Sequence, residues 1–450
     1  MKTVYVVGAG PAGLFAAQKI AAAGHQVVIF NRDIKPGGLA EYGIYPVKDK
    51  MKVGLRKQFA KVLSLPNVHY FGHVRVGNGY SITIEDLRDF QPAAMVFAVG
   101  AQGTKDLNLP GEDCRRVYSA KDFVYHYNQL PPFASQDFST GKRIAIVGMG
   151  NVMVDIARWV LQDDPDRLTE ELIVVARRGP FEAKFDEREF VHIEQHLDRQ
   201  DFQQELERIQ PCLAAVGQDI ANVAGKTFPI LAKPYEPVRP RLKFRFLYSP
   251  VSIHAGASGC IDRLTVRENI LVERDGSLSA KGTDRTADLD VDTMIFAIGD
   301  SADPNVGLPY GAEGYVTRPG AADPGHPRYE IFDPQSQSVV AGTFAVGWAR
   351  KASEGLVGIA RHDGEVGAAT VLQYLEAISE TAAATPEEIY RYLTRRGIPA
   401  VSKEDLHYLS LAEEREATSR GLQYFKYSGN DSMLAAIEEE RRKAGSVVTG

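Results

Sequence analysis

Two glycine-rich turns carry the clearest chemistry in this sequence. The first, GAGPAG, places Gly8, Gly10 and Gly13 in a GxGxxG pattern directly after an apolar stretch. In this pattern the first glycine permits a tight turn, the second lets the backbone approach a pyrophosphate, and the third lets a helix pack closely on a strand. Phosphate oxygens then bind the free N–H groups at the positive end of the helix. The turn therefore indicates nucleotide binding, and its alternative is a tight turn in another kind of α/β protein.

The second turn, GMGN, repeats the arrangement with Gly148 and Gly150, and we expect Asn151 to cap the helix that follows. At the end of the next strand stand Arg177 and Arg178, where an NAD-specific unit tends to carry an acid. Two guanidinium groups can bind a 2′-phosphate, which NADP carries and NAD lacks. The pair therefore favours NADP, and its alternative is a solvated basic strand end.

One residue departs from the usual pattern of the first turn. Asn31 ends the strand VVIFN, at the position where a ribose-binding acid is expected. An asparagine can hydrogen-bond a ribose hydroxyl, although without the added strength of an ionised partner. Asp33 could compensate, but an aspartate in a loop is more often solvated. We expect Asn31 to hold a ribose by a neutral hydrogen bond.

These residues need strands and helices to position them. The opening segment MKTVYVVGAGPAGLFAAQKIAAAGHQVVIF is typical of a strand, a helix and a second strand, which together make one βαβ unit. KRIAIVGMGNVMVDIARWVL and the following ELIVVARRGP make a second such unit. The segment 128–141 between them is polar and contains proline, as connections between domains often do. Two nucleotide-binding units imply two nucleotides.

The composition excludes several classes of protein. The chain has 450 residues, 44% of them hydrophobic and 24% charged, with a formal net charge of −6, so it is no general binder of polyanions. No apolar run approaches the roughly 20 residues that cross a bilayer, and the N-terminus leads directly into a strand, so we expect a cytoplasmic enzyme. Cys114, Cys212 and Cys260 are isolated, which excludes a CxxC dithiol reductase and a resident iron–sulfur cluster.

A family resemblance extends along nearly the whole chain. After GAGPAG come PGGLAEYGI, YFGHVRVG, AVGAQGTKDLNLPGED, SAKDFVYHYNQLP, GMGNVMVDIAR, ARRGP, FRFLYSP and GW followed by GLVG. In this order the segments resemble the flavoprotein family of adrenodoxin reductase and the bacterial ferredoxin–NADP reductases, with glutamate synthase small subunits as more distant kin. The resemblance implies non-covalently bound FAD, an NADPH site and one-electron delivery to a ferredoxin-like iron–sulfur protein.

The resemblance also implies an α/β fold with two Rossmann-like dinucleotide-binding domains. The NADPH-binding domain, residues 104–299, would be inserted into an FAD-binding domain made of residues 1–103 and 300–450. The end of the chain from about residue 385 would be helical, because TPEE is a good helix start.

Site residues follow from the same resemblance. It implies FAD contacts at Gly8, Gly10, Ala12, Gly13, Asn31, Gly38, Leu39, Gly43, Val74, Trp348, Gly355, Leu356 and Val357. It implies NADP contacts at Gly148, Gly150, Asn151, Val152, Arg177, Arg178, Glu189 and Gly355. The third small position of the second turn is Met153 instead of the family's alanine.

Three residues would lie nearest the reaction. Trp348 would pack beside the flavin ring, although KASEG follows it where the family often has RGPTG. In YGIYPVKDK, Lys48 replaces a family histidine, and Asp155 matches the aspartate that this histidine contacts. We hypothesise that Lys48 and Asp155 form a charged contact between the domains, without the pH sensitivity of a histidine. The alternative for Lys48 is a surface lysine.

A basic segment offers a docking surface for the electron acceptor. KPYEPVRPRLKFRF carries Lys233, Arg239, Arg241, Lys243 and Arg245 in an otherwise acidic protein. Such a patch could steer an acidic ferredoxin, while the alternating charges could equally be the solvent face of a strand.

Two other functions use similar nucleotide-binding units. A flavin-dependent monooxygenase would couple oxygen reduction to a substrate, whereas a ferredoxin reductase needs no such substrate. An electron-input flavin subunit would work only inside a larger complex, and it would co-purify with its partner.

Overall fold

The computed structural model describes residues 1–274, 276–319, 329–350, 357–379 and 382–448. The chain divides into two compact units. The first unit contains residues 1–105, 125–135 and 299–450, and the second contains residues 106–124 and 136–298. The first unit therefore includes the short segment 125–135, which the sequence analysis placed inside the NADPH-binding domain. The identity of the cofactor that each unit binds stays a prediction.

A six-stranded sheet forms the centre of the first unit, in the order β17-β18-β4-β1-β2-β3. All neighbours pair in parallel except β17 and β18, which are antiparallel. The strands are β1 (Thr3–Val7), β2 (Gln26–Phe30), β3 (Val68–Phe71), β4 (Ala94–Phe97), β17 (Glu330–Asp333) and β18 (Ser338–Ala345). Both faces of this sheet are covered, which explains the nearly continuous apolar sequence of its strands.

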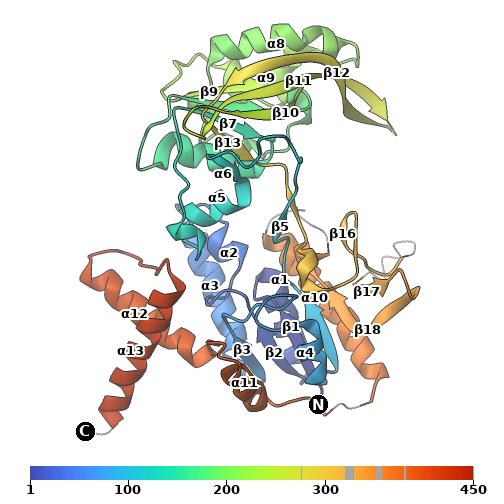
Figure 1. The fold of residues 1–450 in the computed structure, drawn as a ribbon, viewed down its shortest axis with the longest axis vertical. Helices are drawn as coiled ribbons and strands as arrows, with labels where there is room; N and C mark the ends of the chain where they lie inside the picture. Colours follow the sequence, from blue (N-terminus) through green and yellow to red (C-terminus); the bar gives the residue numbers. More distant parts are fainter. Residues whose placement is uncertain (275, 320–328, 351–356, 380–381, 449–450) are drawn as a thin grey trace. The chain divides into compact units, whose positions relative to one another are not determined.

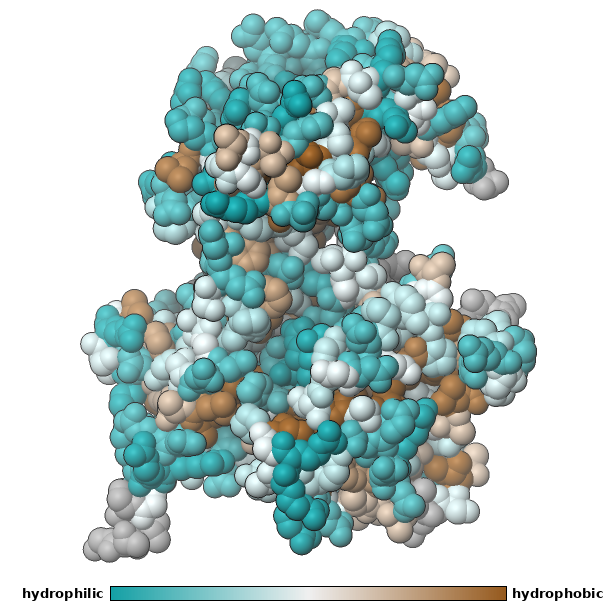
Figure 2. Space-filling view, in the orientation of Figure 1, coloured by the Kyte–Doolittle hydropathy of each residue, from teal (hydrophilic) through white to brown (hydrophobic). Residues whose placement is uncertain are grey.

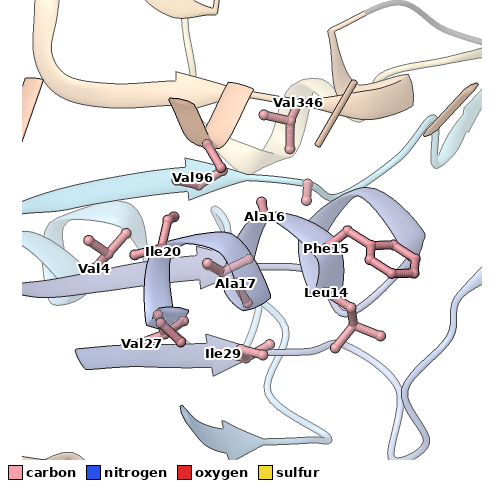
Figure 3. Packing of buried hydrophobic residues seen from close by; sticks show 14 of the residues in the cluster. Val4, Leu14, Phe15, Ala16, Ala17, Ile20, Val27, Ile29, Val96 and Val346 are labelled. Carbon is pink, nitrogen blue, oxygen red and sulfur yellow. The ribbon is translucent and has the colours of Figure 1, made fainter. Parts of the chain in front are cut away.

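Helices α1 (Pro11–Ala22) and α10 (Val357–Ala377) pack together on one face of this sheet (Figure 1). Ala16, Ala17 and Ile20 of α1 lie over the strand residues, as Figure 3 shows. The two helices approach closely because α10 carries Gly364, where a Cβ atom would lie 2.2 Å from the Ala12 carbonyl oxygen. Helix α10 therefore packs directly against the start of α1, beside the first glycine turn.

The opposite face of the sheet is covered by α4 (Ile84–Asp89) and α11 (Pro386–Arg395). Side chains alternate along β1, so that Val4 faces α1 while Tyr5 faces the other cluster. Thr385 caps α11 in a capping box with Glu388, as the TPEE sequence predicts.

A helical hairpin ends the first unit. Helices α12 (Lys403–Ser419) and α13 (Asn430–Val448) pack side by side (Figure 1). Their apolar residues Leu409, Met433 and Ile437 form a small cluster with Ile34, which lies in the loop after β2. The C-terminal part of the chain therefore contacts the loop that follows the first βαβ unit.

The second unit contains a five-stranded parallel sheet in the order β6-β13-β7-β8-β9. Its strands are β6 (Val117–Ser119), β7 (Arg143–Val147), β8 (Glu171–Val175), β9 (Arg241–Arg245) and β13 (Thr293–Phe296). A separate antiparallel sheet consists of β10 (Tyr248–Ala255), β11 (Ile261–Arg274) and β12 (Ser277–Asp290). Helix α6 (Asn151–Arg158) follows the second glycine turn, and α8 (Arg199–Ala214) packs on β9 and β11.

The remaining α-helices and strands of the described residues are α2 (Leu39–Tyr42), α3 (Asp49–Leu63), β5 (Gly103–Thr104), α5 (Ala120–Tyr127), α7 (Glu187–Phe190), α9 (Val223–Lys226), β14 (Asp300–Ser301), β15 (Tyr310–Gly311) and β16 (Gly314–Tyr315). On the face drawn in Figure 2, hydrophilic residues predominate and apolar residues occur in small groups. Within the described ranges, no helix is both long and apolar enough to cross a membrane.

Candidate nucleotide-binding sites

The first glycine turn is packed tightly on its protein side and open above its second glycine. Gly8 has φ +105°, and a Cβ atom there would lie 2.4 Å from the Ala98 carbonyl oxygen. A Cβ atom at Gly13 would lie 2.0 Å from the Gly8 carbonyl oxygen. At Gly10, by contrast, no protein atom lies within 4 Å of where a Cβ atom would be. The turn therefore leaves open space where a pyrophosphate approaches such a turn, so its residues fit a dinucleotide.

The PGG loop, Pro36 to Gly38, contacts the first glycine turn. The Gly37 N–H donates to the Ala9 carbonyl oxygen at 2.7 Å. Gly38 has φ +51°, and a Cβ atom there would lie 3.3 Å from the Gly10 Cα atom. Gly37 has φ +117° and, like Gly38, a backbone conformation that favours glycine. The structure therefore brings together the two glycine motifs assigned to FAD from the sequence.

Asn31 is buried, and its side chain is engaged within the protein. Its Oδ1 accepts a hydrogen bond from the Ala9 N–H at 3.0 Å. Its amide group donates to the carbonyl oxygens of Asp33 and Lys35, at 2.8 and 3.1 Å, and to the Tyr70 hydroxyl at 3.0 Å. Only the second lone pair of Oδ1 is left for a ribose hydroxyl. The ribose contact stays a prediction, and the demonstrated role of Asn31 is to connect the glycine turn with the loop after β2.

This network predicts a large effect for an isosteric change. Asn31→Asp should lower the free energy of unfolding by about 2 kcal/mol, because a carboxylate cannot donate to the two carbonyl oxygens and places a charge in a buried position. Urea denaturation of the apoprotein measures this effect. Asn222→Asp makes the same chemical change at an exposed position and serves as the control. Equal unfolding free energies for the two variants would contradict the prediction.

The segment that contains Trp348 begins against the first turn. At Gly347, which has φ +65°, a Cβ atom would lie 2.6 Å from the Ala12 Cβ atom. The Gly347 N–H donates to Asp363 Oδ2 at 2.5 Å, and the Tyr329 hydroxyl donates to Asp363 Oδ1 at 3.1 Å. Trp348 is half-buried in the short helical turn that follows. The structure therefore brings the GW segment and the GAGPAG turn together.

Asp363 is a positioning residue that the sequence analysis missed. Its carboxylate forms an ion pair with Arg350 in addition to accepting from Gly347 and Tyr329. Burial and the nearby carboxylate raise the pKa of Tyr329, so this phenol stays protonated as a donor. The signal in the sequence was weak, because a single acid sixteen residues after Gly347 follows no motif.

Other residues assigned to FAD have mixed surroundings. Gly43 ends α2, and its N–H donates to the Leu39 carbonyl oxygen at 2.8 Å. Val74 is buried in the core, and its N–H donates to the Asn31 carbonyl oxygen at 2.9 Å. Val357 begins α10. Gly355 and Leu356, the remaining residues of this assignment, lie outside the described residues.

The second glycine turn has the same geometry as the first. Gly148 has φ +121°, and a Cβ atom there would lie 2.2 Å from the Ala297 carbonyl oxygen, whereas no protein atom lies within 4 Å of where a Cβ atom would be at Gly150.

The prediction that Asn151 caps α6 is wrong. Gly150 is the N-cap, so Asn151 is already the first helical residue, and its Oδ1 accepts from the Asp186 N–H at 2.7 Å. Asn151 thus ties the turn to the segment before α7.

The arginine pair lies at the end of β8, directly beyond the strand that follows this turn. Arg177 is exposed and Arg178 is half-buried. Their carbonyl oxygens are bonded to Asn269 Nδ2 and the Leu247 N–H, which fixes the backbone of the pair. Within the described part of the chain, neither guanidinium forms an ion pair or a side-chain hydrogen bond. Both groups are therefore available to an anionic ligand, as a 2′-phosphate site requires.

Three further predictions remain untested. Glu189 lies half-buried in α7, and Val152 is an exposed residue of α6. Lys48 is the N-cap residue of α3 in the first unit, and Asp155 lies on α6 in the second. The NADP contacts of Glu189 and Val152 and the contact between Lys48 and Asp155 stay predictions. Met153 is fully buried, so this side chain packs where the family has alanine.

The basic segment is less positive than its sequence indicates. Its second half is strand β9, in which half-buried charged residues alternate with the buried Leu242 and Phe244. Lys243 forms an ion pair with Glu171, and Arg245 forms a bidentate pair with Asp201 at 2.7 and 2.8 Å. The remaining cations are Lys233, Arg239 and Arg241.

Metal and disulfide chemistry find no support in the described residues. They contain no group of three or more histidine, cysteine, aspartate or glutamate residues that could hold a metal ion. Cys114, Cys212 and Cys260 are all free thiols.

Several known proteins are similar to this chain. The family of pyridine nucleotide-disulphide oxidoreductases matches residues 2–207. NADPH-ferredoxin reductase FprA of Mycobacterium leprae is 29% identical over 416 residues, which cover 84% of this chain and 85% of that protein. The mitochondrial NADPH:adrenodoxin oxidoreductase of Bos taurus is 27% identical over 96% and 92% of the two chains. The structure of Mycobacterium tuberculosis FprA in complex with NADPH is similar with a TM-score of 0.78 at 26% identity, covering 97% of this chain and 99% of that chain.

Proposed function

We propose that this chain, which belongs to the adrenodoxin reductase and ferredoxin–NADP reductase family of flavoproteins, passes a hydride from NADPH to FAD and then single electrons to a ferredoxin-like iron–sulfur protein. The observation that carries this proposal is the presence of two open glycine turns, of which one is followed by two arginines whose guanidinium groups have no partner among the described residues. We assign FAD to the first unit and NADPH to the second, and we place the enzyme in the cytoplasm.

In this proposal the protein supplies binding and orientation. Backbone N–H groups of the first turn and the PGG loop would hold the pyrophosphate of FAD, and Asp363 fixes the start of the Trp348 segment beside the same turn. The flavin, when bound, supplies the change from two-electron to one-electron chemistry. Arg177 and Arg178 would bind the 2′-phosphate of NADPH and so select it over NADH. No side chain needs to act as a strong acid or base.

The matching family model is named for disulphide oxidoreductases, but the free cysteines of this chain support a reaction without a dithiol. A dithiol relay needs two cysteines close enough to bridge. The chain contains three cysteines, all of them free and none in a CxxC pair. The electrons of the proposed reaction therefore leave from the flavin.

Stopped-flow spectroscopy of the purified yellow protein tests the function. We expect NADPH to bleach the flavin absorbance under anaerobic conditions much faster than NADH does, and the reduced protein should then reduce added ferredoxin without another substrate. Equal rates for the two nucleotides would contradict the assigned selectivity. A requirement for an organic substrate before reoxidation would favour a monooxygenase, and activity only in a complex would favour an electron-input subunit.

The acceptor would dock on the part of the basic segment that is not neutralised. Arg239 is exposed, and Arg241 binds the Pro237 carbonyl oxygen while no carboxylate is paired with it among the described contacts. Ferredoxins are acidic, so these charges would steer association at low salt.

Reversing both charges tests this docking surface. The double variant Arg239→Glu and Arg241→Glu should raise the apparent KM for ferredoxin about tenfold at low ionic strength, because two attractive charges become repulsive. Reduction of a small dye should not change, since a dye needs no protein surface. The control pair Lys281→Glu and Arg274→Glu, at exposed positions of β12 and β11, makes an equal charge change elsewhere in the second unit. If the double variant and this control have the same KM, the docking surface lies elsewhere.

A further inference from the structure

The tail segment, residues 420–429 between α12 and α13, returns to the loop that carries Gly38. Its residue Lys426 is buried, with 7% of its side chain exposed. The ammonium group donates to the Asn128 carbonyl oxygen at 2.7 Å, lies 3.5 Å from Glu41 Oε1 and lies 4.5 Å from the centroid of the Tyr42 ring. One cation therefore connects three segments of the first unit that are distant in sequence.

The contacts of Lys426 lie one helical turn away from the phosphate-binding backbone. Glu41 and Tyr42 belong to α2, the single helical turn whose N-cap residue is Gly38. Gly38 in turn packs against Gly10 of the first glycine turn. A shift at the C-terminal end of α2 therefore moves the backbone that faces the proposed pyrophosphate.

Glu41 is contacted both by Lys426 of the tail segment and by Arg56 of helix α3. Arg56 of α3 donates to Glu41 through Nε and Nη2 at 2.7 and 2.8 Å, and its guanidinium lies 4.2 Å from the centroid of the Tyr424 ring. Burial alone would raise the pKa of Glu41, but the hydrogen bonds from Arg56 and the charges of Lys35 and Lys426 outweigh it and hold this pKa at about 2. Glu41 is therefore ionised throughout the physiological range.

The surroundings of Lys426 contain more cations than anions. The charged and titratable groups that face it from the neighbouring elements are Lys35, Glu41, Tyr42, Lys52, Arg56, Glu413 and Tyr424. Burial lowers the pKa of Lys426 from its usual 10.5 to about 8, Glu41 opposes this change, and the nearby cations add to it. An ammonium group buried at such a cost indicates a functional constraint on its position.

We infer that Lys426 is a positioning residue for the FAD site, which fixes the loop from Pro36 to Gly43 against the first glycine turn. The inference rests on the proposed function, because it assumes that FAD binds at this turn. It assigns a role in cofactor binding to the C-terminal tail segment, which has no glycine motif of its own.

The experiment compares FAD affinity in three variants by titrating apoprotein and following the quenching of flavin fluorescence. Lys426→Met should raise the Kd for FAD about tenfold, the equivalent of one charge-assisted hydrogen bond. Lys426→Arg should restore most of the affinity, because a guanidinium can still donate to Asn128 and stack on Tyr42. Lys57→Met, an exposed change next to Arg56 on α3, is the matched control. Equal affinities for Lys426→Met and Lys57→Met would overturn the inference.

A pH profile provides a readout that a purely structural role would not move. Between about pH 8 and 10.5 the docked lysine binds fewer protons than a released one, so docking of the tail segment releases protons and becomes tighter as pH rises. FAD dissociation from the wild type should therefore slow across this range, and it should not slow in Lys426→Arg. Identical profiles would overturn the inference even if Lys426→Met does not fold. A wild-type apoprotein that binds no FAD at any pH would instead refute the proposed function.

Discussion

Replacing Arg177 and Arg178 together by alanine should lower kcat/KM for NADPH by about 100-fold or more and leave kcat/KM for NADH nearly unchanged. Each guanidinium would donate charge-assisted hydrogen bonds to the 2′-phosphate, worth about 1.5–3 kcal/mol per arginine. About 1.4 kcal/mol corresponds to a factor of ten, so the two losses multiply to this size. NADH has no 2′-phosphate, and its binding should not depend on these residues.

Steady-state dye reduction with both nucleotides measures this effect. Replacing Arg267 and Arg274 together by alanine removes two exposed arginines from β11 of the same unit and controls for the change in net charge. The variant with Arg177→Lys and Arg178→Lys should retain part of the preference for NADPH over NADH, because a lysine keeps the charge but loses the forked geometry. A double alanine variant that still prefers NADPH over NADH as strongly as the control would show that the 2′-phosphate is recognised elsewhere.

A pair of alanine substitutions should separate cofactor binding from folding in the first unit. Gly8→Ala forces a side chain into a positive-φ conformation and against the Ala98 carbonyl oxygen at 2.4 Å, so the apoprotein should lose about 4 kcal/mol of stability. Gly10 has φ −76° and no protein atom near its missing Cβ, so Gly10→Ala should keep the stability of the apoprotein. Its affinity for FAD should nevertheless fall about 10- to 100-fold, because the methyl group would take space that a phosphate needs.

Thermal unfolding of the apoproteins and FAD titration measure the two properties separately. The same contrast applies in the second unit, where Gly148 is crowded and Gly150 is open. Normal FAD binding by Gly10→Ala would show that the pyrophosphate does not approach this turn. A loss of apoprotein stability in the same variant would show that the space above Gly10 is filled by protein.

The parts of this structure that could be predicted from sequence are those determined by local patterns. A glycine turn between an apolar strand and an alanine-rich helix is specified within about 30 residues, and both turns have the expected backbone. The α/β fold with two dinucleotide-binding units was predicted correctly on this basis. The family resemblance depended instead on the order of motifs along nearly the whole chain.

Contacts between distant segments could not be predicted in the same way. The segment 125–135 joins the first unit because Tyr125 donates to Gln102 at 3.2 Å and packs near the Arg32 guanidinium, at 5.9 Å, and neither contact leaves a periodic signal. Asn31 was interpreted from its place at a strand end, although its hydrogen bonds to Asp33, Lys35 and Tyr70 depend on the loop's path. Asn151 is the first helical residue instead of the cap, because Gly150 before it already has the extended backbone of an N-cap residue.

The pairing of β18 with β4 has a consequence for the order of events during synthesis. When residues 1–105 have left the ribosome, β4 is still an unprotected edge strand, and the face of α1 that α10 will cover is still exposed. All residues of the second unit are made before β18 and α10 emerge. The second unit can therefore complete its fold first. The first unit can fold completely only when the last third of the chain supplies β18 and α10, which pack against β4 and α1.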